Sequence, residues 1–176
     1  MSFQNVCSPL TIGFMEALYF SRMASPIGPL LVAVSERGLV RLEFSRDSSQ
    51  PPPNWIASEE QTAPYVRELQ EYFRGERRQF DFPLDLRGTD FQKRCWRALL
   101  EIPYGETRSY ADIARAVGSP QAFRAVGMAN HHNPIAIVVP CHRVIASNGT
   151  LCGYGGGLDV KQRLLELEKT GKAAAA

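Results

Sequence analysis

Two short helical segments separated by a tight turn constrain this chain more than any other feature of its sequence. The first begins at Ser109 and ends at Gly118, and Ser119-Pro120 is expected to start the second, with Ser as N-cap and Pro at the first helical position. This second helix is expected to span Pro120–Asn130. Two such helices form a helix-turn-helix, whose second helix enters the groove in proteins that bind DNA. Many helix pairs are only structural, so the pattern alone does not establish DNA binding.

The segments around this unit carry their own start and turn signals. Thr89-Asp90-Phe91-Gln92 has capping-box spacing, which predicts a helix with residues 91, 95, 96 and 99 on its apolar face. Asn148-Gly149 predicts a hairpin turn between strands at 144–145 and 150–152, and a hairpin after a helix-turn-helix is typical of a wing. A glycine-rich loop then leads to a final helix over Asp159–Glu168.

The first half of the chain has the pattern of a sheet. Three strand-like runs are separated by turn residues: Leu18–Met23, Leu30–Val34 and Leu39–Phe44. Helical spacing predicts that Ala63–Phe73 covers one face of this antiparallel meander, and Phe80–Phe82 is expected to be extended.

These elements predict an α/β (α+β) fold in two parts. Residues 1–87 are expected to form a small N-terminal antiparallel sheet with a helix, preceded by a tail at 1–15. Residues 88–176 are expected to form a C-terminal helical domain with a winged helix-turn-helix.

Charge and apolar runs limit the classes of protein that fit. Residues 1–87 hold 9 basic and 11 acidic side chains, giving −2, while residues 88–176 hold 11 and 7, giving +4. This balance permits nucleic-acid binding without demanding it. The longest apolar runs, Pro29–Val34 and Ile135–Pro140, are too short to span a bilayer. The first basic residue is Arg22, so we expect no secretory signal and a cytoplasmic protein with reduced thiols.

The dipeptide Cys141-His142 is a candidate for nucleophilic chemistry. It follows the apolar run Ile135–Pro140, which is expected to be buried. The thiolate is the reactive form of cysteine, and nearby cationic or imidazole groups lower the pKa of a thiol. Adjacent residues need not touch, however, so the dipeptide alone fits an inert buried cysteine beside a surface histidine at least as well.

The wider sequence separates these readings. Pro140-Cys141-His142-Arg143-Val144, with Asn133-Pro134 before it and Gly153-Tyr154 and Gly156-Gly157-Leu158 after it, resembles the O6-alkylguanine-DNA alkyltransferase family. These are the methylated-DNA–protein-cysteine methyltransferases, and the match is to the bacterial constitutive type. The resemblance implies DNA repair by irreversible, single-turnover transfer of an alkyl group from O6-alkylguanine, and also from O4-alkylthymine. It further implies a monomer that acts on double-stranded DNA, with no membrane association, cofactor or metal.

The same resemblance implies roles for individual residues. Cys141 would accept the alkyl group, His142 would act through a water as its base, and Glu168 would orient His142. Tyr110 would donate a hydrogen bond to the departing guanine, which gains negative charge. Arg124 would fill the gap left when the nucleotide flips out of the duplex.

Further residues are implied to bind DNA, to line the pocket or to support the site. The expected DNA contacts beside Arg124 are Ser119, Gln121, Ala125 and Asn130. The expected pocket comprises Val144, Tyr154, Gly155 and Gly156, with structural support from Asn133 and Arg143. By contrast, Cys95, Cys152 and Met128 are expected to be packing residues.

Two other functions stay open at the level of sequence. One is a non-catalytic winged-helix lesion sensor or regulator, although lesion sensors related to this family lack the reactive cysteine that Cys141 would supply. The other is a hydrolase that uses Cys141 and His142 for acyl transfer, which would not predict an arginine on a recognition helix. All three histidines lie in the second half, and Cys7 is the only cysteine in the first, so no zinc site is expected.

Overall fold

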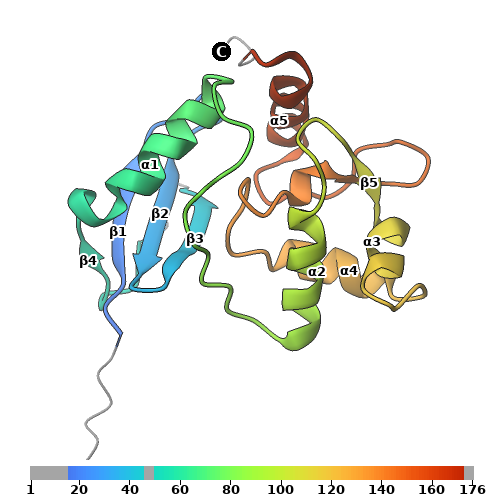
Figure 1. Cartoon of the computed structure of the whole chain (residues 1–176), viewed down its shortest axis with the longest axis horizontal. Coiled ribbons are helices and arrows are strands. Elements are labelled where there is room, and N and C mark those ends of the chain that lie inside the picture. Colours follow the sequence, from blue (N-terminus) through green and yellow to red (C-terminus); the bar gives the residue numbers. More distant parts are fainter. Residues whose placement is uncertain (1–15, 46–49, 173–176) are drawn as a thin grey trace, which may run out of the picture.

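The computed structural model describes residues 16–45 and 50–172, so the tail predicted at residues 1–15 lies outside the described residues. The fold is mixed α/β, as predicted. Figure 1 shows a small sheet covered by helix α1 on one side, and the helices of a C-terminal helical domain on the other. No helix in the described ranges is long and apolar enough to cross a membrane.

The three predicted strands are present with nearly the predicted bounds. They are β1 (Tyr19–Met23), β2 (Leu30–Ser35) and β3 (Gly38–Phe44), paired antiparallel in the order β3-β2-β1. A fourth strand, β4 (Ile56–Ala57), pairs parallel with β1 and was not predicted, since two residues carry no periodicity. Every residue of β2 is buried, which makes it the central strand of the core.

Helix α1 (Glu59–Phe73) begins four residues before the predicted start at Ala63. Its N-cap is Ser58, whose side chain accepts a hydrogen bond from the Gln61 backbone N–H. The first turn is mainly solvent-exposed, so apolar spacing could not detect it. The piece expected to be extended at Phe80–Phe82 is not a strand, and its two aromatic rings pack against each other 5.3 Å apart.

The helical domain contains the predicted capped helices. Helix α2 (Asp90–Leu100) has the capping box between Thr89 and Gln92, and α3 (Tyr110–Ala116) is capped by Ser109 with Asp112. Helix α4 (Phe123–His131) begins at Phe123, with Ala122 as N-cap. The prediction that it begins at Pro120 with Ser119 as N-cap is therefore wrong. The Ser119 carbonyl accepts from the Ala122 N–H at 2.8 Å, so residues 119–122 form a separate turn.

The wing is also different from the prediction. The turn at Asn148-Gly149 is present, because Gly149 has φ +84° and its N–H donates to the Ala146 carbonyl. Residues 150–152 do not form a strand, however. Strand β6 (Val144–Ile145) instead pairs parallel with β5 (Arg108–Ser109), which immediately precedes α3.

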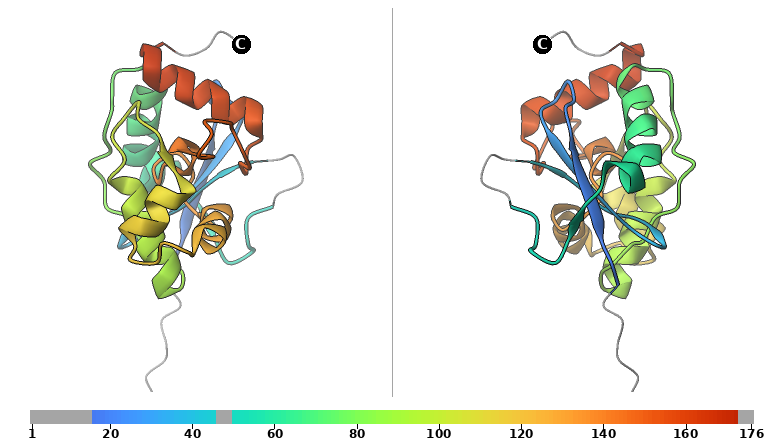
Figure 2. Two further views of the ribbon diagram at one scale, coloured as in Figure 1. Left: turned by 90° about the vertical axis from the view of Figure 1, so that its right-hand side faces the viewer. Right: turned by 90° about the vertical axis from the view of Figure 1, so that its left-hand side faces the viewer.

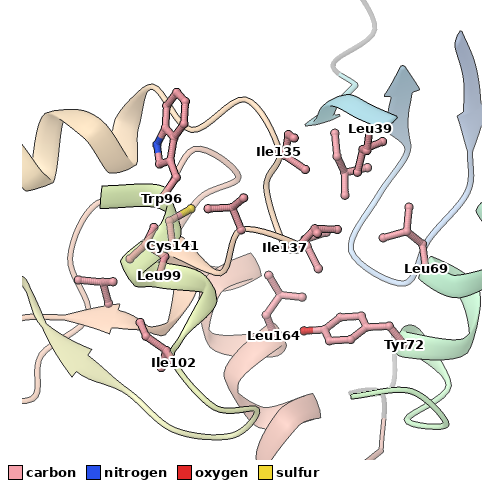
Figure 3. Close-up of a cluster of buried hydrophobic side chains, with 14 of the residues drawn as sticks. Leu39, Leu69, Tyr72, Trp96, Leu99, Ile102, Ile135, Ile137, Cys141 and Leu164 are labelled. Atoms are coloured by element: carbon pink, nitrogen blue, oxygen red, sulfur yellow. The ribbon is translucent and has the colours of Figure 1, made fainter. Parts of the chain in front are cut away.

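The sheet and the helical domain share one continuous core. Leu42 of β3 donates its N–H to the Pro134 carbonyl and accepts from the Ala136 N–H, both at 2.9 Å. Figure 3 shows Leu39 and Leu69 from the sheet side facing Ile135, Ile137 and Leu164 from the helical side. Helix α5 (Leu158–Thr170) completes this core, and its C-terminal end meets that of α1 at one end of the molecule (Figure 2).

Candidate active site at Cys141

Cys141 lies at the start of a short 3-10 helix, η1 (Cys141–Arg143), at the end of the buried apolar run. Its side chain belongs to the core cluster, and the residue is only 8% exposed. The run before it is irregular, and Ile137 adopts φ +72°, a left-handed conformation that is unfavourable for a β-branched residue. Such backbone outliers persist where the surrounding structure fixes them, and they cluster at functional sites.

Asn133, which was expected to support the site, has hydrogen bonds to both ends of this segment. Its side-chain Nδ2 donates to the Val139 carbonyl at 2.8 Å and lies 3.2 Å from Cys141 Sγ. Its Oδ1 accepts from the Ile135 N–H at 3.0 Å. One side chain therefore connects the first turn of the segment to the thiol at its end.

His142 and Glu168 form a buried pair. His142 Nε2 lies 2.8 Å from Glu168 Oε1, and both side chains are fully buried. An ionised carboxylate only accepts hydrogen bonds, so Nε2 carries the proton and Nδ1 is the acceptor in the neutral imidazole. Nδ1 is buried and has no hydrogen-bond partner among the described residues. The free acceptor of His142 is therefore the nitrogen that could receive a proton.

The Glu168 carboxylate has several further donors. Arg143 Nε binds Oε2 and Arg143 Nη2 binds Oε1, each at 2.9 Å, and the Gly105 N–H binds Oε2 at 3.1 Å. The Tyr72 hydroxyl of α1 donates to Oε1 at 2.7 Å. Burial raises the pKa of Glu168, but the bonds and charges of His142 and Arg143 outweigh it and hold that pKa well below its ordinary value. Glu168 is therefore ionised and rigidly held.

Burial also sets the proton affinity of the two candidate reacting groups. It lowers the pKa of His142, which favours the neutral imidazole. It raises the pKa of the Cys141 thiol, while the Asn133 hydrogen bond and the Lys161 charge act in the opposite direction. Lys161 is itself fully buried, and its Nζ donates to the Val144 carbonyl at 2.6 Å and the Cys152 carbonyl at 2.8 Å. The thiol is thus protonated at rest but lies beside groups that favour its ionisation.

A cavity of about 170 Å³ opens beside the thiol. Asn130, Tyr154 and Gly155 line it together with Cys141 and with Phe44 of β3. The amide atoms of Asn130 and the hydroxyl of Tyr154 are buried without hydrogen-bond partners among the described residues. Buried polar groups are normally paired, so unpaired atoms in residues that line a cavity are unusual.

The expected pocket residues Val144 and Gly156 and the expected catalytic residue Tyr110 are not among the residues that line this cavity. Tyr110 is half-buried and lies beside Gly127 of α4. Burial, together with a hydrogen bond to Cys152, raises the pKa of Tyr110, so its hydroxyl stays a donor at neutral pH. Val144 is buried immediately after η1. Gly156 lies against the Phe44 ring, where a Cβ atom would come within 2.8 Å of ring carbons.

The expected DNA contacts lie on or just before α4. Arg124, Gln121 and Ala125 are exposed, whereas Ser119 and Asn130 are half-buried.

The prediction that Met128 packs in the core is wrong, because α4 buries Val126 and Ala129 and leaves Met128 56% exposed. Cys95, by contrast, is fully buried, as expected for a packing residue.

Sequence reasoning missed three residues that shape the site. Tyr72 and Phe44 were recognised only as apolar positions of a helix and a strand, and Lys161 was not singled out. Only the apolar spacing marks Tyr72, which is 96 residues from Glu168. Within the described ranges, no group of three or more His, Cys, Asp or Glu side chains could hold a metal ion.

The fold and the site together define a mixed α/β protein with a buried cysteine next to a His–Glu pair and a helix-turn-helix. Two family models cover most of the chain. The 6-O-methylguanine DNA methyltransferase ribonuclease-like domain matches residues 18–86, and the DNA-binding domain of the same family matches residues 90–170. The chain belongs to the methylated-DNA–protein-cysteine methyltransferase family.

Individual relatives agree with this assignment. The methylated-DNA–protein-cysteine methyltransferase of Methanosarcina barkeri is 50% identical over 154 residues, which cover 86% of this chain and 98% of the relative. The Mycobacterium bovis protein of the same name is 52% identical and covers 87% of this chain and 93% of its own length. Among solved structures, Mycobacterium tuberculosis OGT in complex with DNA has a TM-score of 0.83 at 52% identity, covering 89% of this chain and 96% of that one.

Proposed function

We propose that this protein repairs double-stranded DNA by moving the alkyl group of O6-alkylguanine, and of O4-alkylthymine, irreversibly onto its own Cys141. The observation that carries the proposal is the cavity beside Cys141, which is lined by Asn130 and Tyr154, two residues whose buried polar atoms have no hydrogen-bond partner among the described residues. The names of the relatives support the same chemistry.

The proposed step is a displacement at the alkyl carbon. The Cys141 thiol gives its proton, through a water, to the free Nδ1 of His142. The sulfur then attacks the alkyl carbon, the S–C bond forms, and the C–O6 bond breaks with its electron pair going to the guanine. Tyr110 donates a hydrogen bond to that departing base, and the guanine finally takes up one proton. A thioether has no easy route back to a thiol, so each chain reacts once.

We propose that α4 supplies the contact with DNA. In this proposal the exposed Arg124 enters the base stack when the damaged nucleotide leaves it, which offsets part of the few kcal/mol that flipping costs. The solved structure of the M. tuberculosis relative in complex with DNA supports DNA as the binding partner. We also propose that residues 1–87 and 88–176 act as two domains of a monomer, a division supported by the bounds of the two family models.

Intact-mass analysis after incubation with excess duplex containing O6-methylguanine tests the proposal. We expect a gain of one methyl group per chain, located on Cys141 by peptide mapping, and no further turnover. Cys141→Ser should bind the duplex without gaining mass, while the matched variant Cys152→Ser should still gain the methyl group.

Two outcomes would favour the other functions. Binding to damaged duplex without any gain of mass in the wild-type chain would indicate a lesion sensor or regulator. Repeated turnover with an unmodified cysteine would indicate a hydrolase.

A further inference from the structure

The hydroxyl of Tyr72 links the sheet side of the molecule to the candidate base. Tyr72 lies in the last turn of α1 and is fully buried, and its hydroxyl donates to Glu168 Oε1 at 2.7 Å. The same oxygen is 2.8 Å from His142 Nε2. The other donors to this carboxylate, from Arg143 and Gly105, belong to the helical domain. Tyr72 is thus the contribution of the N-terminal sheet and helix to the His142–Glu168 pair.

The ring of Tyr72 is held in place by neighbouring aromatic side chains. Its centroid lies 5.4 Å from that of Phe73, 5.6 Å from that of Phe80 and 6.1 Å from that of Tyr104. In Figure 3 the side chain points from α1 toward Leu164 of α5, the helix that carries Glu168. A ring fixed in this way presents its hydroxyl to the carboxylate with little freedom.

We propose that Tyr72 is a positioning residue for alkyl transfer, whose hydroxyl fixes Glu168 Oε1 and draws off part of its charge so that the paired His142 stays a neutral base. The proposal rests on the function proposed above, because it assigns His142 the role of accepting the Cys141 proton. Its physical basis is that hydrogen bonds to a carboxylate disperse its negative charge, which would otherwise stabilise an imidazolium.

The other charged groups around His142 determine how large this effect can be. Arg143 and Lys161 both disfavour the imidazolium, whereas Glu168 favours it, and burial lowers the pKa of His142. The Tyr154 ring lies 6.4 Å from the imidazole and adds no charge, because burial keeps its hydroxyl protonated. Removal of the Tyr72 hydroxyl therefore acts through Glu168, the carboxylate that favours protonation of His142.

Tyr72→Phe in the full chain tests this inference. The substitution keeps the packed ring, and Oε1 keeps its bonds to His142 and Arg143, so the fold should be preserved. Single-turnover methyl transfer should be slowed about 3- to 10-fold near pH 6 and should recover toward the wild-type rate near pH 8. The His142 ring signals, followed by NMR without DNA, should titrate at a higher pH than in the wild type.

Tyr104→Phe is the matched control. It removes a hydroxyl from the same aromatic cluster, but that hydroxyl donates to the Leu167 carbonyl at 3.4 Å instead of to the Glu168 side chain. An unchanged rate profile and an unchanged His142 titration in Tyr72→Phe would overturn the proposal, as would equal changes in both variants. If the wild-type chain gains no methyl group, the proposed function fails, while the NMR titration still decides whether Tyr72 controls the charge of His142.

Discussion

The side-chain nitrogen of Asn133 lies 3.2 Å from Cys141 Sγ and donates at the same time to the Val139 carbonyl. Asn133 therefore orients the thiol and holds the chain that precedes it. A residue with these two tasks should affect reactivity and stability together when it is replaced.

Asn133→Ala should lower the free energy of unfolding by about 1–3 kcal/mol, because the Val139 carbonyl and the Ile135 N–H lose their buried partner. The Asn133 hydrogen bond lowers the pKa of Cys141, so its loss should raise that pKa and slow alkylation of the thiol at neutral pH. Denaturant titration and the pH profile of the alkylation rate measure the two effects. Asn148→Ala, at an exposed turn, is the matched control, and equal effects in both variants would contradict this role.

Stability should fall as the pH falls below neutrality. Burial lowers the pKa of His142 from its ordinary value of 6.5. The hydrogen bonds and charges of His142 and Arg143 hold the pKa of Glu168 below its ordinary value of 4.5 despite burial. The unfolded chain therefore binds more protons than the folded chain at both positions. Their contribution is complete above about pH 6.5 and is lost on acidification, first at His142 and then at Glu168, with slopes up to about 1.4 kcal/mol per pH unit per group. Urea titrations from pH 4 to 8 measure this.

His142→Gln should remove the part of that loss between pH 6.5 and 4.5. The matched control variant is His132→Gln, at an exposed position. The assignment to His142 would be wrong if the two variants unfolded with the same pH dependence.

Gly156→Ala should alter the pocket with little cost to the fold. The added Cβ would lie 2.8 Å from the outer carbons of the Phe44 ring, which lines the cavity beside Cys141, so the ring must move. We expect slower methyl transfer, and a larger loss of rate for bulkier alkyl groups. Gly155→Ala is the control in the same loop, because a Cβ there meets nothing within 4 Å. A similar rate loss in both variants would rule out the Phe44 contact as the cause.

Arg124→Ala should slow repair of duplex DNA by about 1–3 kcal/mol in activation free energy, while reaction with free O6-methylguanine base is much less affected. The free base is already unstacked, so a side chain that fills the gap in the base stack does not speed its reaction. Single-turnover rates on the two substrates measure the difference. Arg74→Ala, an exposed arginine at the end of α1, should affect neither rate. An equal fall on both substrates would mean that Arg124 supports the pocket or the fold.

Local signals in the sequence predicted local structure well. Turn residues between apolar runs identified β1, β2 and β3. The capping box at Thr89 identified the start of α2, and the predicted helix start at Ser109 agrees with α3. The Ser119-Pro120 signal was wrong because a backbone hydrogen bond closes a turn there before α4 begins. A sequence pattern that is typical of a helix start can thus form a separate turn instead, because of one backbone hydrogen bond.

The candidate site was only partly accessible to such reasoning. Cys141, His142 and Glu168 could be named from motif resemblance, and the structure brings the last two into direct contact. The bond from Tyr72 to Glu168 could not be predicted, because it joins residues 96 positions apart in two parts of the fold. The prediction that Met128 is buried was wrong, because a helix of nine residues with two buried side chains has no clear apolar face.

The bonds between Leu42 and the segment at 134–136 have a consequence for solubility. Together with the bridge from Leu39 to Leu84, they cover the outer side of β3, which would otherwise present unpaired N–H and C=O groups. Exposed strand edges are templates for pairing with other chains, which leads to aggregation. The segment that carries Cys141 therefore also covers the edge of the sheet. A conformational change that separates this segment from β3 would expose a strand edge that promotes aggregation.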